Sequence, residues 1–143
     1  MFGHPLHPAL VHFPIGLLLS ATVADAAWLA GFTQDVHLAG VMMAGGLAAG
    51  LVAMGAGLVD FTRLDERVVP HALRHMAAVG LAWLGYAVTL YLRRDALIGN
   101  AGDIAPTSVA LSFASALVLA LGGWLGGRLV YSFGAGVTDA GRR

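Results

Sequence analysis

The sequence contains no cysteine and no lysine, and only 11% of its 143 residues are charged. The absence of cysteine excludes disulfide bonds, thiolate metal sites, cysteine-ligated iron–sulfur clusters and covalent CxxCH haem attachment. The net charge is zero, which gives no electrostatic footprint for nucleic acid. Soluble domains carry about 25% charged residues, whereas this chain is 58% hydrophobic. A soluble fold of this size could not bury so much apolar surface, so the composition predicts a protein embedded in the lipid bilayer.

Four long apolar stretches follow one another, and each is long enough to cross a hydrocarbon core of about 30 Å as a helix. The connections between them are short, so we expect neighbouring helices to be antiparallel. The sequence therefore predicts an all-α membrane protein, a four-transmembrane-helix up-and-down bundle. We expect a His-Pro-rich entry strip at residues 1–13, the bundle at 14–131 and a polar C-terminal tail at 132–143. The four stretches are Pro14–Gly31, Leu38–Val59, His71 (or Met76) to Leu92, and Thr107–Val130.

Arginine placement predicts the orientation in the membrane. With four spans, the N-terminus, the 60–70 connection and the C-terminus share one side. The opposite side carries only Arg93 and Arg94. Cytoplasmic segments are enriched in basic residues, so we expect both termini in the cytoplasm. The arginines of the shared side are Arg63, Arg67, Arg74, Arg128, Arg142 and Arg143.

Five of the six histidines can be placed at the same end of this bundle, on the cytoplasmic side. His4, His7 and His12 precede the first span, and His71 and His75 open the third. Ionisable side chains at membrane depth are functional-site candidates by default. The prolines among the first three make that strip a poor helix, which we expect to fold back across the bundle mouth. His37 lies at the opposite end, where we expect it to be interfacial.

The histidines leave three interpretations open. The first and third helices are diagonal partners, so His12 and His75 could face each other across a haem b, with His71 and His7 as further cofactor-binding candidates. Nitrogen and oxygen ligands also suit a non-haem transition metal. Alternatively, the imidazoles only bond carbonyls or water at the headgroup level. The candidate metal ligands are His4, His7, His12, His71, His75 and Asp60.

Asp25 and the glycine pairs need an account within the membrane. We expect no arginine at the depth of Asp25, so its carboxyl is protonated, or hydrogen-bonded to a hydroxyl such as that of Ser112 or Ser115 or to the end of a neighbouring helix. Its role is then either a proton relay or a structural polar anchor. Glycines four residues apart allow helices to approach closely, and we expect them to pack within the bundle. The alternatives are homodimerisation or a groove for a flat cofactor. Similarity between the two halves is too weak to indicate a repeat. The glycine pairs are Gly46-x-x-x-Gly50, Gly122-x-x-x-Gly126 and Gly123-x-x-x-Gly127.

The segment His4-Pro5-Leu6-His7-Pro8-Ala9-Leu10-Val11-His12-Phe13-Pro14-Ile15-Gly16 resembles a family of small bacterial membrane proteins, domain-of-unknown-function family 2231. Asp25, Gly57, Asp60, His71 and His75 are similar to later features of that family. The resemblance implies four membrane helices and a prokaryotic source, so we expect the protein in a bacterial inner (cytoplasmic) membrane. Some family members are joined to Rieske-type iron–sulfur domains, which implies an electron-transfer setting.

These observations predict a small integral membrane protein that acts as a haem- or metal-binding redox subunit through the histidine cluster. Its expected partners are the lipid bilayer and either a membrane redox protein or a second copy of the chain. The alternative is a cofactor-free structural or assembly subunit of a larger membrane complex. A small transporter or channel that uses Asp25 ranks last, because four short spans conduct only as an oligomer or through a very small pore.

Overall fold

The computed structural model describes residues 6–99 and 104–135. Within these ranges, helices are the only regular secondary structure, and turns and loops connect them. Four of the helices are long and apolar enough to cross a membrane, as the hydropathy of the sequence predicts. Two short helices, α1 and α5, accompany them. In chain order the helices are α1 (Leu6–Leu10), α2 (His12–Leu29), α3 (His37–Phe61), α4 (Val69–Leu92), α5 (Arg94–Gly99) and α6 (Pro106–Phe133).

The entry strip is helical from Leu6, so the expectation of a poor helix that folds back over the bundle is wrong for this part. Helix α1 leads almost without interruption into α2, and together they form an apolar segment from His7 to Leu29. Pro8 and Pro14 fall in the first turns of α1 and α2. The first turn of a helix tolerates proline because the missing N–H would have no intrahelical partner there.

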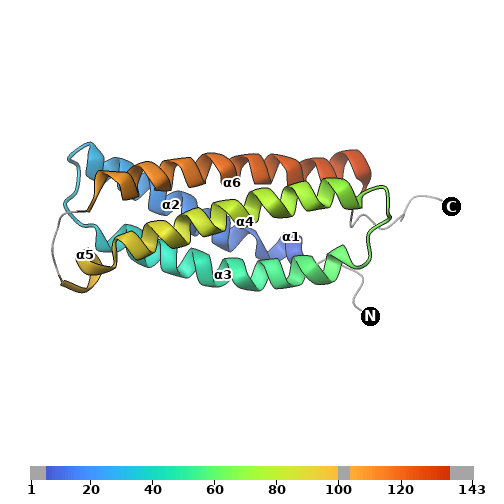
Figure 1. Cartoon of the computed structure of the whole chain (residues 1–143), viewed down its shortest axis with the longest axis horizontal. Helices are drawn as coiled ribbons and strands as arrows, with labels where there is room; N and C mark the ends of the chain where they lie inside the picture. The colour runs from blue at the N-terminus through green and yellow to red at the C-terminus, as the bar shows by residue number, and fades with distance from the viewer. Residues whose placement is uncertain (1–5, 100–103, 136–143) are drawn as a thin grey trace.

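The long helices run up and down, and the two ends of the bundle differ (Figure 1). The start of α1, the end of α6 and the 62–68 connection lie at one end, and α5 lies at the other. Helix α2 packs against α3 and α6, and α4 packs against the same two helices. The pairs α2–α4 and α3–α6 are therefore diagonal, as expected for this topology.

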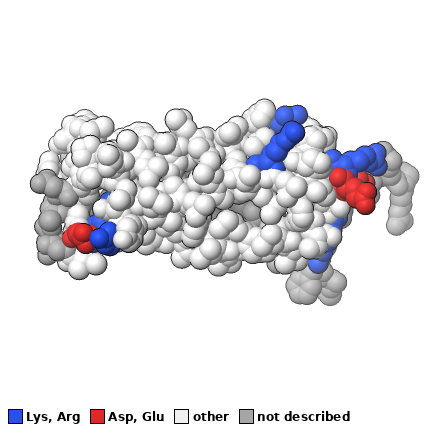
Figure 2. Space-filling model, in the orientation of Figure 1, with Lys and Arg blue, Asp and Glu red and all other residues white. Residues whose placement is uncertain are grey.

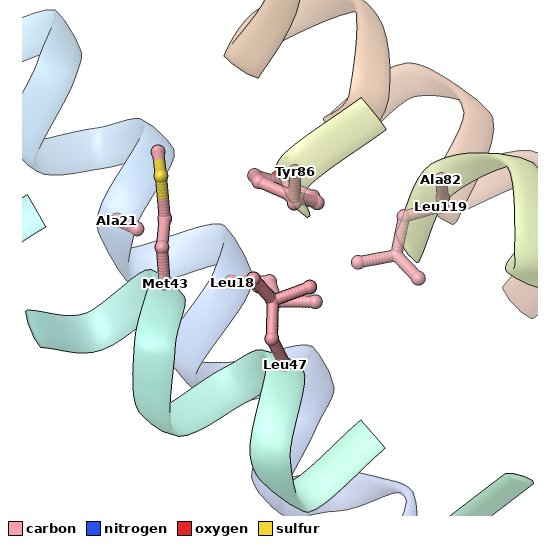
Figure 3. Packing of buried hydrophobic residues seen from close by; sticks show 7 residues of the cluster. All are labelled: Leu18, Ala21, Met43, Leu47, Ala82, Tyr86 and Leu119. Carbon is pink, nitrogen blue, oxygen red and sulfur yellow. The ribbon is translucent and has the colours of Figure 1, made fainter. Parts of the chain in front are cut away.

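The centre of the bundle is filled by apolar side chains from all four long helices (Figure 3). Outward-facing leucine and valine side chains cover much of the exterior. On the face that Figure 2 shows, charged side chains gather towards the ends of the molecule and leave an uncharged band between them. Such a band suits contact with lipid tails. The central cluster consists of Leu18, Ala21, Met43, Leu47, Ala82, Tyr86 and Leu119.

Glycines allow the helices to approach closely at several points, as expected. A Cβ atom built on Gly46 would lie 2.7 Å from Leu18, and one on Gly50 would lie 3.0 Å from Trp83. Gly122 faces Val79 in the same way. Gly123 faces open space, so the Gly123-x-x-x-Gly127 pair does not serve packing inside the bundle.

The connections carry most of the exposed charge. In the 62–68 connection the backbone N–H of Arg67 donates to the carboxylate of Asp65, and its guanidinium does so as well. These contacts hold the pKa of Asp65 below its usual range. At the other end α5 occupies part of what the sequence indicated as a plain connection, and Arg94 packs over the Tyr91 ring there.

Candidate metal centre

Two imidazoles meet at the end of the bundle where α1 begins and α6 ends. His7 lies on α1, which leads into α2, and His75 lies on α4. The two histidines therefore come from the diagonal spans α2 and α4. Their ring centroids are 6.1 Å apart and the ring planes are inclined by 77°. Both side chains are half-buried. A histidine that precedes the first span thus lies beside one at the start of the third, but the pair is His7 with His75 and not the predicted His12 with His75.

Each of these imidazoles is fixed by one backbone carbonyl. The Nδ1 atom of His7 lies 2.8 Å from the carbonyl oxygen of Ala53 on α3, and Nδ1 of His75 lies 2.8 Å from that of Gly122 on α6. A carbonyl only accepts, so each Nδ1 carries the proton and donates it. The neutral ring then has its lone pair on Nε2, which is the usual arrangement behind a metal-binding histidine. Among the described residues, neither Nε2 has a hydrogen-bond partner.

A glycine makes room for each ring. A Cβ on Gly57 would lie 3.0 Å from Nδ1 of His7, and a Cβ on Gly126 would lie 2.9 Å from Cε1 of His75. Both distances are too short for an ordinary carbon contact. Each glycine lies four residues, about one helical turn, after the carbonyl that anchors the ring. The imidazoles are thus held against α3 and α6 by a hydrogen bond and by close backbone contact.

The other candidate residues are dispersed. His12 is exposed on the outside of the bundle, so its expected place on a wall of the core opposite His75 is wrong. His71 packs against Phe133 with ring centroids 4.2 Å apart, and its buried Nδ1 has no hydrogen-bond partner in the part of the chain that the structure describes. Oδ2 of Asp60 is likewise buried and unpartnered. His4 lies outside the described residues.

Between residues 6 and 99 and between 104 and 135, no three His, Asp or Glu side chains gather closely enough to hold a metal ion. Six residues are expected from the sequence to ligate the metal. Within the described part of the chain, His7 and His75 are the only two of them whose rings are in contact. His37 starts α3 at the opposite end and lies beside Asp35, in agreement with its expected separation from the cluster.

Asp25 has a partner that the sequence analysis missed. Arg93, the residue after α4, donates from Nη1 and Nη2 to both carboxylate oxygens of Asp25, at 2.6 and 2.8 Å. Both side chains are almost completely buried. The expectation of a carboxyl without an arginine at its depth is therefore wrong. Charge-assisted bidentate pairs of this kind are the strong ones, and their geometry is specific.

Hydroxyl groups from three helices meet one turn before this ion pair. Oγ1 of Thr22 on α2 lies 2.7 Å from Oη of Tyr86 on α4 and 3.0 Å from Oγ of Ser112 on α6. Ser112 therefore bonds to Thr22, whereas Ser115 donates to the carbonyl of Leu111 in its own helix. The expected hydroxyl partners of Asp25 are thus engaged elsewhere.

The model of one protein family matches residues 3–139, and its description is "Predicted membrane protein (DUF2231)". The chain belongs to this family. The match extends over nearly the whole chain and contains all six histidines as well as Asp25 and Arg93. No curated protein and no solved structure matched the chain. Membership in the family agrees with the four membrane-spanning helices and is consistent with the resemblance of the N-terminal segment.

Proposed function

We propose that this integral membrane protein binds one transition-metal centre, a haem iron or a single ion, through Nε2 of His7 and Nε2 of His75. We further propose that the centre transfers electrons to or from a membrane partner. The observation that carries the proposal is the pair of imidazoles whose Nδ1 atoms are anchored and whose Nε2 atoms have no hydrogen-bond partner among residues 6–99 and 104–135. A hydrogen bond from the ring nitrogen that does not bind the metal fixes the tautomer and the orientation of a metal-binding ring.

The separation of the two rings suits a shared metal. Two imidazoles that bind one metal through Nε2, at about 2.0–2.1 Å each, have ring centroids about 5–6.5 Å apart, depending on the angle at the metal. The observed separation is 6.1 Å. Imidazole nitrogen suits zinc, copper, iron and nickel, and two axial imidazoles also suit haem. Electron transfer is the function we infer for the iron and copper members of this set.

Arginine placement supports a location in a bacterial inner membrane with both termini in the cytoplasm. Arg93 is buried against Asp25, so Arg94 is the exposed arginine at the α5 end. Arg63, Arg67 and Arg128 are exposed at the end where α1 begins and α6 ends. The imidazole pair lies at this basic end, which the positive-inside rule assigns to the cytoplasmic side.

The experiment that tests the function is a spectrum and an elemental analysis of the purified full-length protein. We expect bound metal, seen as a Soret band for haem or as a stoichiometric non-haem element. His7→Ala and His75→Ala should each remove it, because one imidazole rarely retains a metal. His37→Ala and His12→Ala should not, since both residues lie away from the pair. Reversible reduction in a potentiometric titration would support electron transfer.

A colourless, metal-free protein whose properties do not respond to His7→Ala would contradict the proposal. The cofactor-free structural or assembly subunit would then be the better interpretation. Retention of metal in both His7→Ala and His75→Ala would instead show that the centre lies elsewhere in the chain.

A further inference from the structure

The buried positions of α3 and α6 follow the same pattern. Six of the seven buried residues of α3 have a buried counterpart in α6 at an offset of 69 residues (122 − 53 for the anchoring carbonyls). The side chains themselves differ, since a glycine corresponds to a serine or a leucine at some positions. The pairs are Ala39 and Ser108, Gly40 and Val109, Met43 and Ser112, Gly46 and Ser115, Gly50 and Leu119, and Ala53 and Gly122.

The first helices of the two halves correspond in the same way. Asp25 and Arg93 are 68 residues apart, and the same offset relates His7 to His75 (75 − 7). Three of the four buried residues between them obey it too: Pro14 and Ala82, Leu18 and Tyr86, and Ala21 and Thr89. The fourth, Thr22, corresponds to Leu90, which is only partly buried. At this offset the two segments share His-x-Ala-x-Val, at residues 7–11 and 75–79.

The imidazole contacts repeat as well. In each half a histidine on the first helix donates to a carbonyl on the second, and a glycine four residues after that carbonyl makes room for the ring. Neither of these contacts follows from the burial pattern. Burial, the buried ion pair and the histidine contacts therefore select one alignment of residues 6–61 with residues 74–130. The offset is 68 in the first helix of each half and 69 in the second, so the second half has one additional residue between its two helices.

We propose that the chain is an internal duplication of one helical hairpin, and that the imidazole pair is a two-fold-symmetric binding site to which each copy contributes a histidine, an anchoring carbonyl and a glycine. The diagonal arrangement of α2 with α4 and of α3 with α6 is what a two-fold axis along the bundle requires. His7 meets His75 on this axis near one end, and Asp25 meets Arg93 on it near the other.

The inference that the site holds a metal rests on the proposed function. The inference that the site is duplicated does not, because it is drawn from burial, the ion pair and the histidine contacts. A ligand on the axis would meet two equivalent nitrogen lone pairs, one from each hairpin. Gly57 and Gly126 are then matched positioning residues, because each sets the place of one ring without touching the ligand.

A metal-free NMR experiment tests the duplicated site. In full-length protein labelled with ¹⁵N-histidine, stripped of metal and held above the usual histidine pKa of about 6.5, His7 and His75 should both show the Nδ1–H tautomer. Gly57→Ala should shift the His7 signals more than those of His75, and Gly126→Ala should shift the His75 signals more than those of His7, because each glycine contacts one ring. The controls are Gly55→Ala on α3 and Gly123→Ala on α6, because both glycines face open space. Different tautomers in the two rings, or a response to only one of the two substitutions, would overturn the proposal.

An exchange of charges tests the axis itself. Asp25→Arg and Arg93→Asp should each lower the melting temperature by roughly 10 °C or more, or prevent folding, because each leaves like charges buried together. The double variant should recover most of the loss, since equivalent positions accept the exchange.

The matched control is the exchange of Thr22 and Tyr86, a buried contact between the same two helices whose residues are 64 apart and so not equivalent. This control should not recover. A charge-exchanged protein that melts as low as the Thr22→Tyr/Tyr86→Thr protein would overturn the symmetry. These readouts need no metal, so failure of the metal proposal would leave them unaffected.

Discussion

His7 rather than His12 meets His75 because α1 is a helix. Residues five apart on a helix point to different sides, whereas residues seven apart point to nearly the same side. His7, Val11 and Pro14 therefore share the inward side and His12 lies outside it. The sequence predicts that the histidines cluster at one end of the bundle, but the prolines predict a non-helical strip, and without the helical spacing the inward-facing histidine cannot be selected.

The hydroxyl of Tyr86 provides a prediction at the residue scale. Tyr86→Phe removes the contact with Thr22 at 2.7 Å and leaves the aromatic packing in place. We expect a loss of about 1 kcal/mol of stability, seen as a fall of a few degrees in the melting temperature in detergent. Tyr131→Phe is the control because that side chain is exposed. Equal melting of the Tyr86→Phe protein and wild type would show that the hydroxyl adds nothing to stability.

At the scale of the helices, the glycine pattern predicts that helices pack closely, but it does not predict which side of each helix makes the contact. Gly122 and Gly123 are adjacent in sequence, yet Gly122 contacts Val79 while Gly123 faces open space. Neighbouring residues on a helix point about 100° apart, and the apolar surroundings on both sides are similar in a membrane protein. Hydropathy therefore indicates that a helix spans the bilayer but not which of its sides faces its neighbours.

Three glycines of α3 form a matched set for a test. Gly46→Leu and Gly50→Leu should each destabilise the protein by about 1–3 kcal/mol, because the new side chains collide with Leu18 and Trp83. Gly55→Leu, on the same helix, should change little, since no atom lies within 4 Å of the added Cβ. Thermal unfolding in detergent with size-exclusion chromatography measures both effects. Normal melting of the Gly46→Leu protein would mean that α2 and α3 are not in close contact there.

At the scale of the whole molecule, length and hydropathy determined the four spans and the short connections determined their order. The Asp25–Arg93 pair does not follow from the sequence because apolar stretches place the two residues at different depths in the membrane. Arg93 was assigned to the connection outside the membrane and Asp25 to its interior. Helix α2 ends at Leu29 and α4 at Leu92, so both residues lie near the same end of the bundle. A depth estimate from apolar stretches alone does not resolve one helical turn.

Orientation is tested with single cysteines in this cysteine-free chain. Glu66→Cys, in the connection between α3 and α4, should react with an impermeant thiol reagent only from the cytoplasmic side. Gln34→Cys, in the connection between α2 and α3, should react only from outside, because the exposed arginines concentrate at the Glu66 end. Both positions are exposed. The reverse labelling pattern would place the imidazole pair on the external side and change the expected partner.

The buried Asp25–Arg93 contact also governs which hairpins can assemble in the bilayer. Two copies of the first hairpin would bring two carboxylates together in an apolar interior, and two copies of the second would bring two guanidinium groups together. Both arrangements are costly in a membrane, so the Asp25–Arg93 contact favours the association of unlike hairpins. Because both hairpins belong to one chain, each first hairpin is made together with a second hairpin of the opposite buried charge. If neighbouring molecules exchanged hairpins, the first hairpin of one molecule would have to pair with the second hairpin of the other.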